Sequence, residues 1–354
     1  TLRETGLLWD EGPDVGGEYG PYIQSERKPI YMEYARKLVE MGHAYYCFCT
    51  KERLESLHTE AGGIAKYDGH CRDIPLEEAD RRIATGEPFV IRQKMPREGT
   101  SSFEDAVFGL VEIDNSELED QILIKSDGYP TYNFANVIDD HLMAITHVVR
   151  GNEYLSSTPK YNLLYDAFGW ERPVYVHCAP VMKDAHAKLS KRNGDASYQD
   201  LIAKGYVSEA VLNYIALLGW SPKGEEEKFT LAEMTQVFDI SGISKSPAIF
   251  DPEKLRWLNA EYIRAMSEED FHKAVLPFIQ QTVKSENADT ALIAKCLHQR
   301  TEVLGEIGAQ IDFIDVLDDY SPDLFINKKS KSTVESSKTM LEAVIPALEA
   351  LPEW

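Results

Sequence analysis

Apolar residues recur every three to four positions between residues 29 and 41, and this spacing predicts an amphipathic helix. Pro29 suits the first turn of such a helix, and Gly42 is placed to end it. The face expected to be buried consists of Ile30, Tyr34, Leu38 and Met41. Residues 1–20 hold a glycine-rich turn before any strand–helix unit is complete, so the sequence opens as if in the middle of a domain.

Short runs rich in aromatic and β-branched residues predict strands in the next part of the chain. These runs are 43–48, 89–92 and 107–113, and a charged stretch over 51–59 predicts a short helix after the first run. Strands mixed with a short helix indicate a small α+β subdomain.

A strand–helix–strand pattern follows a further strand predicted over 121–125. A buried strand is expected over 145–150, and a second strand over 174–177. Between them a helix is expected over 158–168, and Gly169 is placed to end it. Two strands joined through a helix run parallel, and this unit builds a Rossmann-like sheet. Ligands bind such sheets at the carboxyl ends of the strands, where a basic loop, residues 181–195, follows directly.

The pattern becomes helical after this loop. Ser208 begins a predicted helix, Thr230 and Glu233 form a predicted capping box, and Ser267 begins another helix. The inward residues of the first helix are expected to be Val211, Leu212, Ile215 and Leu218. The predicted fold class is therefore α/β: a Rossmann-like parallel sheet with an inserted α+β subdomain, followed by all-α domains.

Composition narrows the classes of function. The chain has 354 residues, 43% of them apolar, which is enough for two or three domains with real cores. No apolar run is long enough for a membrane span, and the first residues do not form a signal peptide, so we expect a cytoplasmic protein and no membrane partner. A formal charge of -22 argues against indiscriminate nucleic-acid binding but leaves room for one local basic strip.

The basic loop has the residue types that bind phosphate. Lys188, Lys191 and Arg192 offer N–H donors with fixed charge, Ser190 offers a hydroxyl, and Gly194 lets the backbone turn. A solvated turn with no ligand is the alternative interpretation of the same residues.

Three of the five cysteines lie close together in the sequence, and they indicate a metal site rather than a disulfide framework. Cys47, Cys49 and Cys71 would supply three thiolates to a structural zinc ion. In the alternative interpretation, Cys47 and Cys49 are strand residues facing one side and Cys71 is unrelated to them. Cys178 and Cys296 stand alone and are expected in the core.

Several motifs follow one another in a fixed order: residues 8–13, 22–27, 127–132, 139–143, 145–151, 188–192 and 250–259. Together they resemble the glutamyl-tRNA synthetases of bacterial type, which are class I aminoacyl-tRNA synthetases. The resemblance implies five segments. They are the remainder of the first half of the catalytic domain (1–45), an inserted acceptor-binding subdomain with a zinc knuckle (46–120), the second half of the catalytic domain (121–180), a stem-contact helical region with the signature loop (181–265) and the start of a helical anticodon-binding domain (266–354).

The resemblance also implies the reaction and its participants. Such enzymes join L-glutamate to ATP, with Mg²⁺, as glutamyl-adenylate and then transfer the glutamyl group to the 3′ end of tRNA(Glu). By resemblance, Lys188 and Lys191 are catalytic, on the pyrophosphate side, and Tyr132, Asn136 and Arg150 bind glutamate. The residues expected at ATP are Glu153, Val181, Met182, Lys188, Ser190 and Lys191. Without the resemblance, Tyr132 could be a core aromatic residue, Asn136 a polar helix residue and Arg150 a partner of Asp139 or Asp140.

The same resemblance bears on the zinc site. Among relatives, a tyrosine four residues before the third cysteine completes the ligand set, and Tyr67 stands in that position. His70 and Asp73 are rival fourth ligands.

One family motif has no counterpart in the sequence: the His-x-Gly-His-type motif that holds ATP near the N-terminus of class I enzymes. We therefore expect a protein limited to these residues to lack normal ATP-dependent activation. The alternatives to a glutamate–tRNA ligase are a glutaminyl-type enzyme, a paralogue that glutamylates a tRNA base, or a catalytically silent zinc and RNA-binding module. We expect a monomer.

Overall fold

The computed structural model describes residues 1–60, 66–189, 197–316 and 319–352. The chain divides into two compact units, one formed by residues 1–201 and 208–258 and the other by residues 202–207 and 259–354. The mixed α/β class with a parallel sheet, followed by helices, is confirmed. The finer division into five segments stays a prediction.

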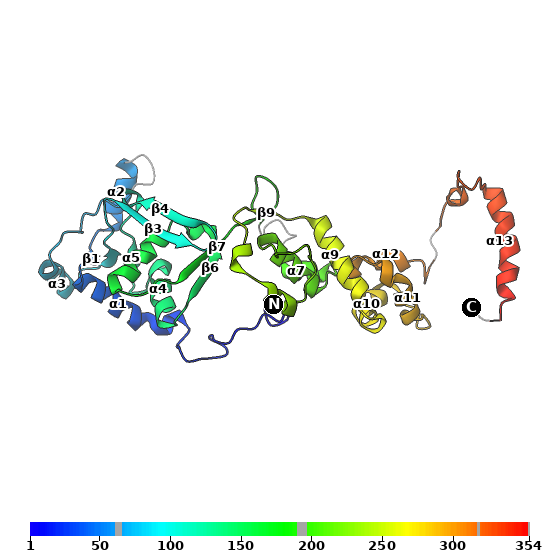
Figure 1. Ribbon diagram of the computed structural model, residues 1–354, viewed down its shortest axis with the longest axis horizontal. Coiled ribbons are helices and arrows are strands. Elements are labelled where there is room, and N and C mark those ends of the chain that lie inside the picture. Colours follow the sequence, from blue (N-terminus) through cyan, green and yellow to red (C-terminus); the bar gives the residue numbers. More distant parts are fainter. Residues whose placement is uncertain (61–65, 190–196, 317–318, 353–354) are drawn as a thin grey trace. The chain divides into compact units, whose positions relative to one another are not determined.

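The first unit holds all the strands assigned in the described chain (Figure 1). They are β1 (Ala44–Cys47), β2 (Val90–Gln93), β3 (Thr100–Asp105), β4 (Gly109–Asp114), β5 (Ile122–Ile124), β6 (His147–Gly151), β7 (Val174–Cys178), β8 (Val181–Met182) and β9 (Ala248–Ile249). The α-helices that begin in it are α1 (Lys28–Glu40), α2 (Lys51–Glu60), α3 (Leu76–Ala84), α4 (Tyr132–Leu142), α5 (Thr158–Phe168), α6 (Tyr198–Ala203), α7 (Ser208–Gly219), α8 (Leu231–Val237) and α9 (Pro252–Ala265). The 3-10 helices are η1 (Gln24–Arg27), η2 (Asn115–Glu117), η3 (Asn152–Tyr154) and η5 (Ile240–Gly242).

The predicted strand–helix–strand unit is present in the four-stranded sheet, whose order is β4-β3-β7-β6. β6 and β7 run parallel, and Arg150 pairs with His177 in their register. Helix α5 joins these strands and ends at Gly169, which adopts a φ of 68° that only glycine reaches without strain. β3 lies on the other side of β7, also parallel, with Asp105 opposite Tyr175. The carboxyl ends of three parallel strands, β3, β7 and β6, therefore lie on the same side of the sheet.

β6 differs from the buried strand predicted over 145–150. It begins at His147 and forms the edge of its sheet, so it has a strand partner on one side only. Val149 is 63% exposed as a result. The apolar run predicted the strand correctly. It could not predict the position of the strand in the sheet, because that position depends on partner strands far away in the sequence.

A three-stranded antiparallel sheet, β1-β2-β5, forms the other layer around which the main core packs. Helix α1 lies against it with Tyr31, Ala35 and Leu38 buried. The predicted face was wrong at its end, since Met41 is 46% exposed. Apolar residues occupy more than one side of this helix, so spacing alone could not select the buried side.

A buried ion pair joins Arg27, at the end of η1, to Asp139 of α4. Arg27, only 2% exposed, donates from Nε to Asp139 Oδ1 at 2.7 Å and from Nη1 to the Pro21 carbonyl at 2.9 Å. The Tyr31 hydroxyl donates to the second Asp139 oxygen at 2.8 Å. The half-buried carboxylate thereby gains one cationic partner and one neutral donor, which together compensate for its loss of water.

Two further expectations from the sequence are wrong in the helical part and among the cysteines. Ile215 of α7, predicted to point inward, is 51% exposed, whereas the buried residues of that helix include Val211 and Tyr214. Cys296 is exposed and Cys178 is half-buried, so neither is a fully buried core thiol. The capping box of Thr230 and the start of α10 at Ser267 are confirmed.

The second unit is helical. Its α-helices are α10 (Glu268–Thr282), α11 (Thr290–Leu297), α12 (Gly308–Ile311) and α13 (Val334–Glu349), with 3-10 helices η6 (His298–Arg300), η7 (Leu304–Glu306) and η8 (Pro322–Phe325). Fully buried Asn259 accepts the Val207 N–H at 2.9 Å and donates to the Glu302 carbonyl at 2.5 Å. Gly205 packs so closely that a Cβ there would lie 2.1 Å from the Gly305 nitrogen. This close approach requires glycine.

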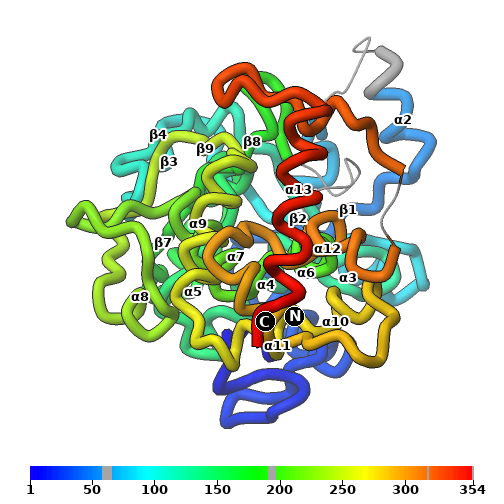
Figure 2. Tube along the Cα trace, turned by 90° about the vertical axis from the view of Figure 1, so that its right-hand side faces the viewer, coloured from blue at the N-terminus to red at the C-terminus, as the bar shows by residue number. Residues whose placement is uncertain are grey.

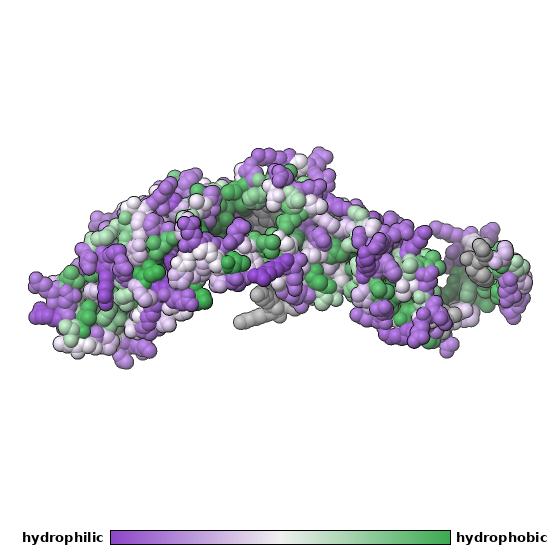
Figure 3. All heavy atoms as spheres, turned by 90° about the horizontal axis from the view of Figure 1, so that it is seen from below, coloured by the Kyte–Doolittle hydropathy of each residue, from purple (hydrophilic) through white to green (hydrophobic). Residues whose placement is uncertain are grey.

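Hydrophilic residues cover most of the face drawn in Figure 3, with hydrophobic residues in smaller groups between them. This surface agrees with a formal charge of -22. Within the described ranges, no helix combines the length and apolar character needed to cross a bilayer.

Candidate active site and thiol cluster

Arg150 lies at the carboxyl end of β6 among aromatic rings. Its guanidinium carbon is 4.8 Å from the ring centre of Tyr161, 5.0 Å from that of Tyr154 and 5.5 Å from that of Tyr175. Ring faces attract a cation, so these contacts favour the charged guanidinium in a half-buried position.

The guanidinium keeps donors free for a ligand. Nε donates to His177 Nε2 at 3.2 Å, and Nη2 donates to the Thr158 hydroxyl at 2.8 Å. A guanidinium has five N–H groups, so within the described ranges three remain after these two bonds. Among the described residues Arg150 has no carboxylate partner, and Asp139 pairs with Arg27 instead. An anion can therefore bind Arg150 without displacing an ion pair.

His177 and Asp105 continue this hydrogen-bonded chain into the core. Both side chains are fully buried, and Nδ1 of His177 lies 2.5 Å from Asp105 Oδ2. Burial lowers the pKa of His177 despite the hydrogen bond that its ring donates to Asp105, so the imidazole is neutral near pH 7. The carboxylate can only accept, so Nδ1 carries the proton and Nε2 accepts the Arg150 N–H.

Tyr132 and Asn136 lie one turn apart on α4 and therefore on the same face. Tyr132 is 56% exposed, so it is not a core aromatic residue, and its ring centre is 5.7 Å from that of Tyr154. The Asn136 side-chain oxygen is buried and has no hydrogen-bond partner in the part of the chain that the structure describes. A buried acceptor of this kind needs a donor, and a bound ligand can supply one.

The basic loop begins as a hairpin. β8 pairs with β9 in parallel, and the two strands lie side by side in Figure 2. Met182 forms an antiparallel bridge with Lys188. The Val181 carbonyl accepts the Leu189 N–H at 3.0 Å, and the Met182 carbonyl accepts the Phe250 N–H at 2.9 Å. Lys188 is exposed. Ser190 and Lys191, also expected at ATP, lie outside the described residues.

Glu153 follows β6 on η3 and is exposed. Its carboxylate lies over Gly151, where a Cβ would come within 2.2 Å of a Glu153 oxygen. Glu153 and Arg150 thus flank the same strand end.

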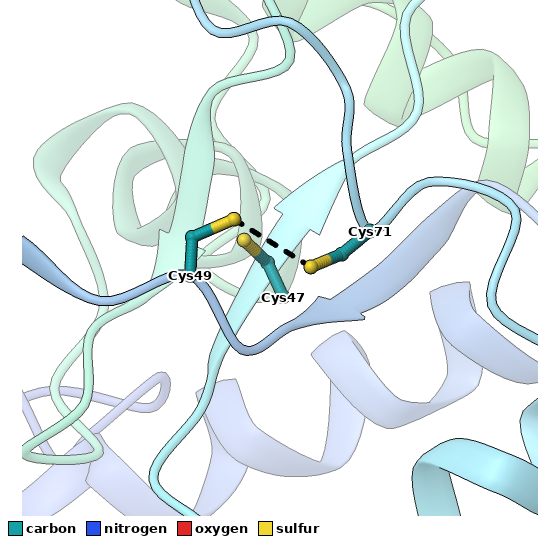
Figure 4. A group of neighbouring side chains, drawn as sticks. All are labelled: Cys47, Cys49 and Cys71. Atoms are coloured by element: carbon teal, nitrogen blue, oxygen red, sulfur yellow. Dashed lines mark hydrogen bonds between the residues drawn. The ribbon is translucent and has the colours of Figure 1, made fainter. Parts of the chain in front are cut away.

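The thiols of Cys47, Cys49 and Cys71 converge, as Figure 4 shows. Their sulfur atoms all lie within 4.8 Å of one another, and those of Cys49 and Cys71 are 3.6 Å apart. Three thiolates at zinc–sulfur distances of about 2.3 Å have sulfur separations close to this value, so the cluster fits a tetrahedral ion. The alternative in which Cys71 is unrelated to the other two is therefore wrong.

Tyr67 is the fourth group at the thiol cluster. Its hydroxyl lies 3.2 Å from the Cys47 sulfur and accepts the Cys71 N–H at 3.1 Å. Asp73 is 86% exposed and 3.7 Å from Lys94, and His70 is exposed as well. Within the described ranges, neither rival belongs to the thiol group.

The pKa values of the groups in this cluster shift in opposite directions. Hydrogen bonds from Cys71 and Tyr67 lower the pKa of Cys47 to about 4, and the same Cys47 bond raises the pKa of Cys71. Burial, together with Cys47, raises the pKa of Tyr67, so its hydroxyl is a neutral phenol in the absence of a metal. The cluster therefore holds a thiolate, which is the form that binds zinc.

The sequence did not point to His177, Asp105, Thr158 or the tyrosines around Arg150. His177 ends a predicted strand and could have been found as a polar residue at a carboxyl end. Asp105 gave no such signal, because β3 was not predicted at all.

Comparison with known proteins decides the family. Residues 2–257 match the family described as class I tRNA synthetases (E and Q), catalytic domain, and residues 270–354 match an anticodon binding domain. A glutamate–tRNA ligase of Clostridium botulinum is 58% identical over 357 aligned positions, which cover 100% of this chain and 73% of that protein. The chain belongs to the class I glutamate–tRNA ligase family. A second member of the glutamate–tRNA ligase family, from Clostridium tetani, is 57% identical over the same share of each chain.

A solved glutamate–tRNA ligase structure agrees with the fold. The enzyme of Elizabethkingia meningosepticum, crystallised in complex with its amino acid, superposes with a TM-score of 0.88 at 31% identity. The superposition covers 99% of this chain and 75% of that one.

Proposed function

We propose that the chain carries the glutamate-recognition and nucleotide-binding surfaces of a glutamate–tRNA ligase, with L-glutamate, ATP–Mg²⁺ and tRNA(Glu) as substrates. Membership of the family makes it a class I aminoacyl-tRNA ligase. The observation that carries the site assignment is Arg150, a half-buried cation with free N–H groups and no carboxylate partner among the described residues. A guanidinium binds a carboxylate through two parallel N–H bonds, so Arg150 suits a carboxylate of glutamate.

The neighbouring groups on α4 complete the proposed amino-acid site. The unpartnered side-chain oxygen of Asn136 accepts an N–H, and the ammonium group of glutamate is such a donor. The Tyr132 hydroxyl, on the same face of the helix, supplies a neutral polar contact. A cation, an acceptor and a neutral hydroxyl match the groups of an amino acid that carries two carboxylates.

The proposed ATP side lies along the hairpin that begins at β8. Lys188, Ser190 and Lys191 bind the phosphates, where fixed cations stabilise the charge that develops as pyrophosphate leaves. Val181 and Met182 contact adenine through their backbone. Their carbonyl groups already accept the Leu189 and Phe250 N–H groups, so other backbone atoms make this contact. Glu153 contacts the ribose or the base.

The proposed zinc site is structural. Cys47, Cys49, Cys71 and Tyr67 would hold the ion and so fix the loop before α3 to the end of β1. Three thiolates with an oxygen close all four positions of zinc, which suits a structural role rather than catalysis. The subdomain held in this way receives the acceptor end of tRNA. We further propose a monomer that works in the cytoplasm.

The test is glutamate-dependent ATP–pyrophosphate exchange by the complete gene product in the presence of tRNA. Lys191→Ala should lower exchange by roughly 2–4 kcal/mol in transition-state terms, because one positioned cation is lost. Lys183→Ala is the matched control, since Lys183 is an exposed lysine of the same hairpin, and it should leave the rate nearly unchanged. Equal effects of the two substitutions would contradict the assignment of the phosphate site.

A further inference from the structure

Hydrogen bonds link Arg150 to His177 and His177 to Asp105. Which atom donates in each bond depends on which ring nitrogen of His177 carries the proton. Asp105 Oδ1 accepts two backbone N–H groups, those of Val107 at 3.0 Å and Phe108 at 2.9 Å. The other carboxylate oxygen, Oδ2, faces His177. The turn between β3 and β4 therefore fixes which oxygen points at the imidazole.

We propose that Asp105 and His177 are positioning residues for glutamate recognition: Asp105 holds His177 in the Nδ1–H tautomer, so that Nε2 accepts the Arg150 Nε–H and orients the guanidinium. This inference rests on the proposed role of Arg150. The two residues do not touch substrate in this scheme, and they act only through Arg150.

The opposite tautomer would place two donors against each other. With a proton on Nε2, the His177 N–H would face the Arg150 Nε–H across 3.2 Å. The Arg150 Nε–H would then lose its acceptor, and the guanidinium would have to turn away from the His177 N–H. The orientation of the free N–H groups of Arg150 thus depends on a residue in another strand.

Protonation of His177 would have the same effect as the wrong tautomer, and its surroundings decide when that happens. The charged and titratable groups that face His177 are Asp105 from β3, Arg150 from β6, Glu153 from η3 and Tyr175 from β7. Arg150 disfavours a second cation beside it, and both carboxylates favour one. Burial outweighs the carboxylates, so the acceptor form of His177 prevails through the neutral range.

Asp105→Asn is the sharpest test because the change preserves shape. The amide oxygen must still accept the Val107 and Phe108 N–H groups, so the amide NH₂ faces His177. Nδ1 then has to accept, and the proton moves to Nε2, against Arg150. We expect the KM for glutamate in ATP–pyrophosphate exchange by the complete gene product to rise about 10- to 100-fold, with the KM for ATP nearly unchanged. NMR of labelled histidine should show the Nδ1–H tautomer in the wild type and Nε2–H in the variant.

Asp114→Asn is the matched control, since that exposed side chain caps η2 and forms no hydrogen bond with His177 or Arg150 among the described residues. His177→Asn keeps a donor for Asp105 but removes the acceptor for Arg150, and should also raise the KM for glutamate. His177→Gln places an amide oxygen near the position of Nε2 and should restore part of the affinity. This pair keeps the test decisive if Asp105→Asn does not fold.

Two negative results have different meanings. A wild-type protein without glutamate-dependent exchange would refute the proposed function. A wild-type protein that activates glutamate, with an unchanged KM for glutamate in Asp105→Asn or equal values in His177→Asn and His177→Gln, would overturn this inference alone.

Discussion

Replacing Arg150 by lysine removes its planar fork while keeping the positive charge. Lysine has no Nε–H for His177 and cannot bind a carboxylate through two parallel N–H bonds. A hydrogen bond to a charged group contributes about 1.5–3 kcal/mol, so the loss of one such bond to glutamate corresponds to roughly 10- to 150-fold in kcat/KM. The expected loss appears in the KM for glutamate, because the cation acts on binding of the amino acid.

The assay is ATP–pyrophosphate exchange with glutamate and ATP varied separately, together with a thermal unfolding scan of each variant. Arg172→Lys is the matched control: Arg172 is 39% exposed and binds Asp166 through two bonds of 2.6 and 2.9 Å. An exposed pair of this kind contributes about 0–1 kcal/mol, and the control should retain nearly full activity. Arg150→Lys with a KM for glutamate close to the wild-type value would refute the assignment of Arg150.

Three other perturbations have definite expected outcomes. Arg27→Met leaves the Asp139 carboxylate without its cation, and chemical denaturation should show a loss of roughly 3–5 kcal/mol in the free energy of unfolding; a loss below about 1 kcal/mol would contradict the buried pair. Cys49→Ser should reduce bound zinc from about one equivalent and lower the Tm by several degrees, while Cys296→Ser, at an exposed position, changes neither; metal analysis that finds no zinc in the wild type would refute the site. Burial raises the pKa of Asp140 to about 6 from an ordinary value of 3.8, so its contribution to stability is full below about pH 4 and is lost as the pH rises through 6. Asp140→Asn should therefore gain roughly 1–3 kcal/mol over the wild type near pH 7 and less near pH 4, and equal gains at both values would contradict the assigned burial.

The parallel unit β6–α5–β7 could be predicted because local signals mark each of its ends. Pro159 in the first turn and Gly169 after the last turn set the limits of the helix, and apolar runs flank it. The edge position of β6 could not be predicted, since β6 owes it to the absence of a second strand partner in the described sheet.

β3 shows why part of the site was invisible in the sequence. Its residues 100–105 are mostly polar, and only alternate positions near its end, Phe103 and Asp105, are buried. Without an apolar run there was no reason to place Asp105 in a sheet, and without Asp105 the role of His177 could not be inferred. Residues that act through a hydrogen-bonded chain are found only when the strands that bring them together are known.

The thiol cluster could be predicted from the sequence only in part. The spacing of Cys47 and Cys49 allowed a shared site to be proposed, but the distance to Cys71 depends on how the intervening segment returns to the end of β1. The structure brings the Tyr67 hydroxyl to the sulfur atoms and leaves His70 and Asp73 exposed, which sequence spacing could not decide.

Charging of tRNA tests the central claim most directly. The complete gene product would be incubated with purified tRNA(Glu), ATP–Mg²⁺ and one labelled amino acid: glutamate, glutamine or aspartate. We predict that glutamate alone becomes attached to the 3′ end of the tRNA, and that Arg150→Lys weakens the reaction while Arg172→Lys does not. Attachment of glutamine in preference to glutamate, or wild-type charging that Arg150→Lys leaves unchanged, would contradict the account.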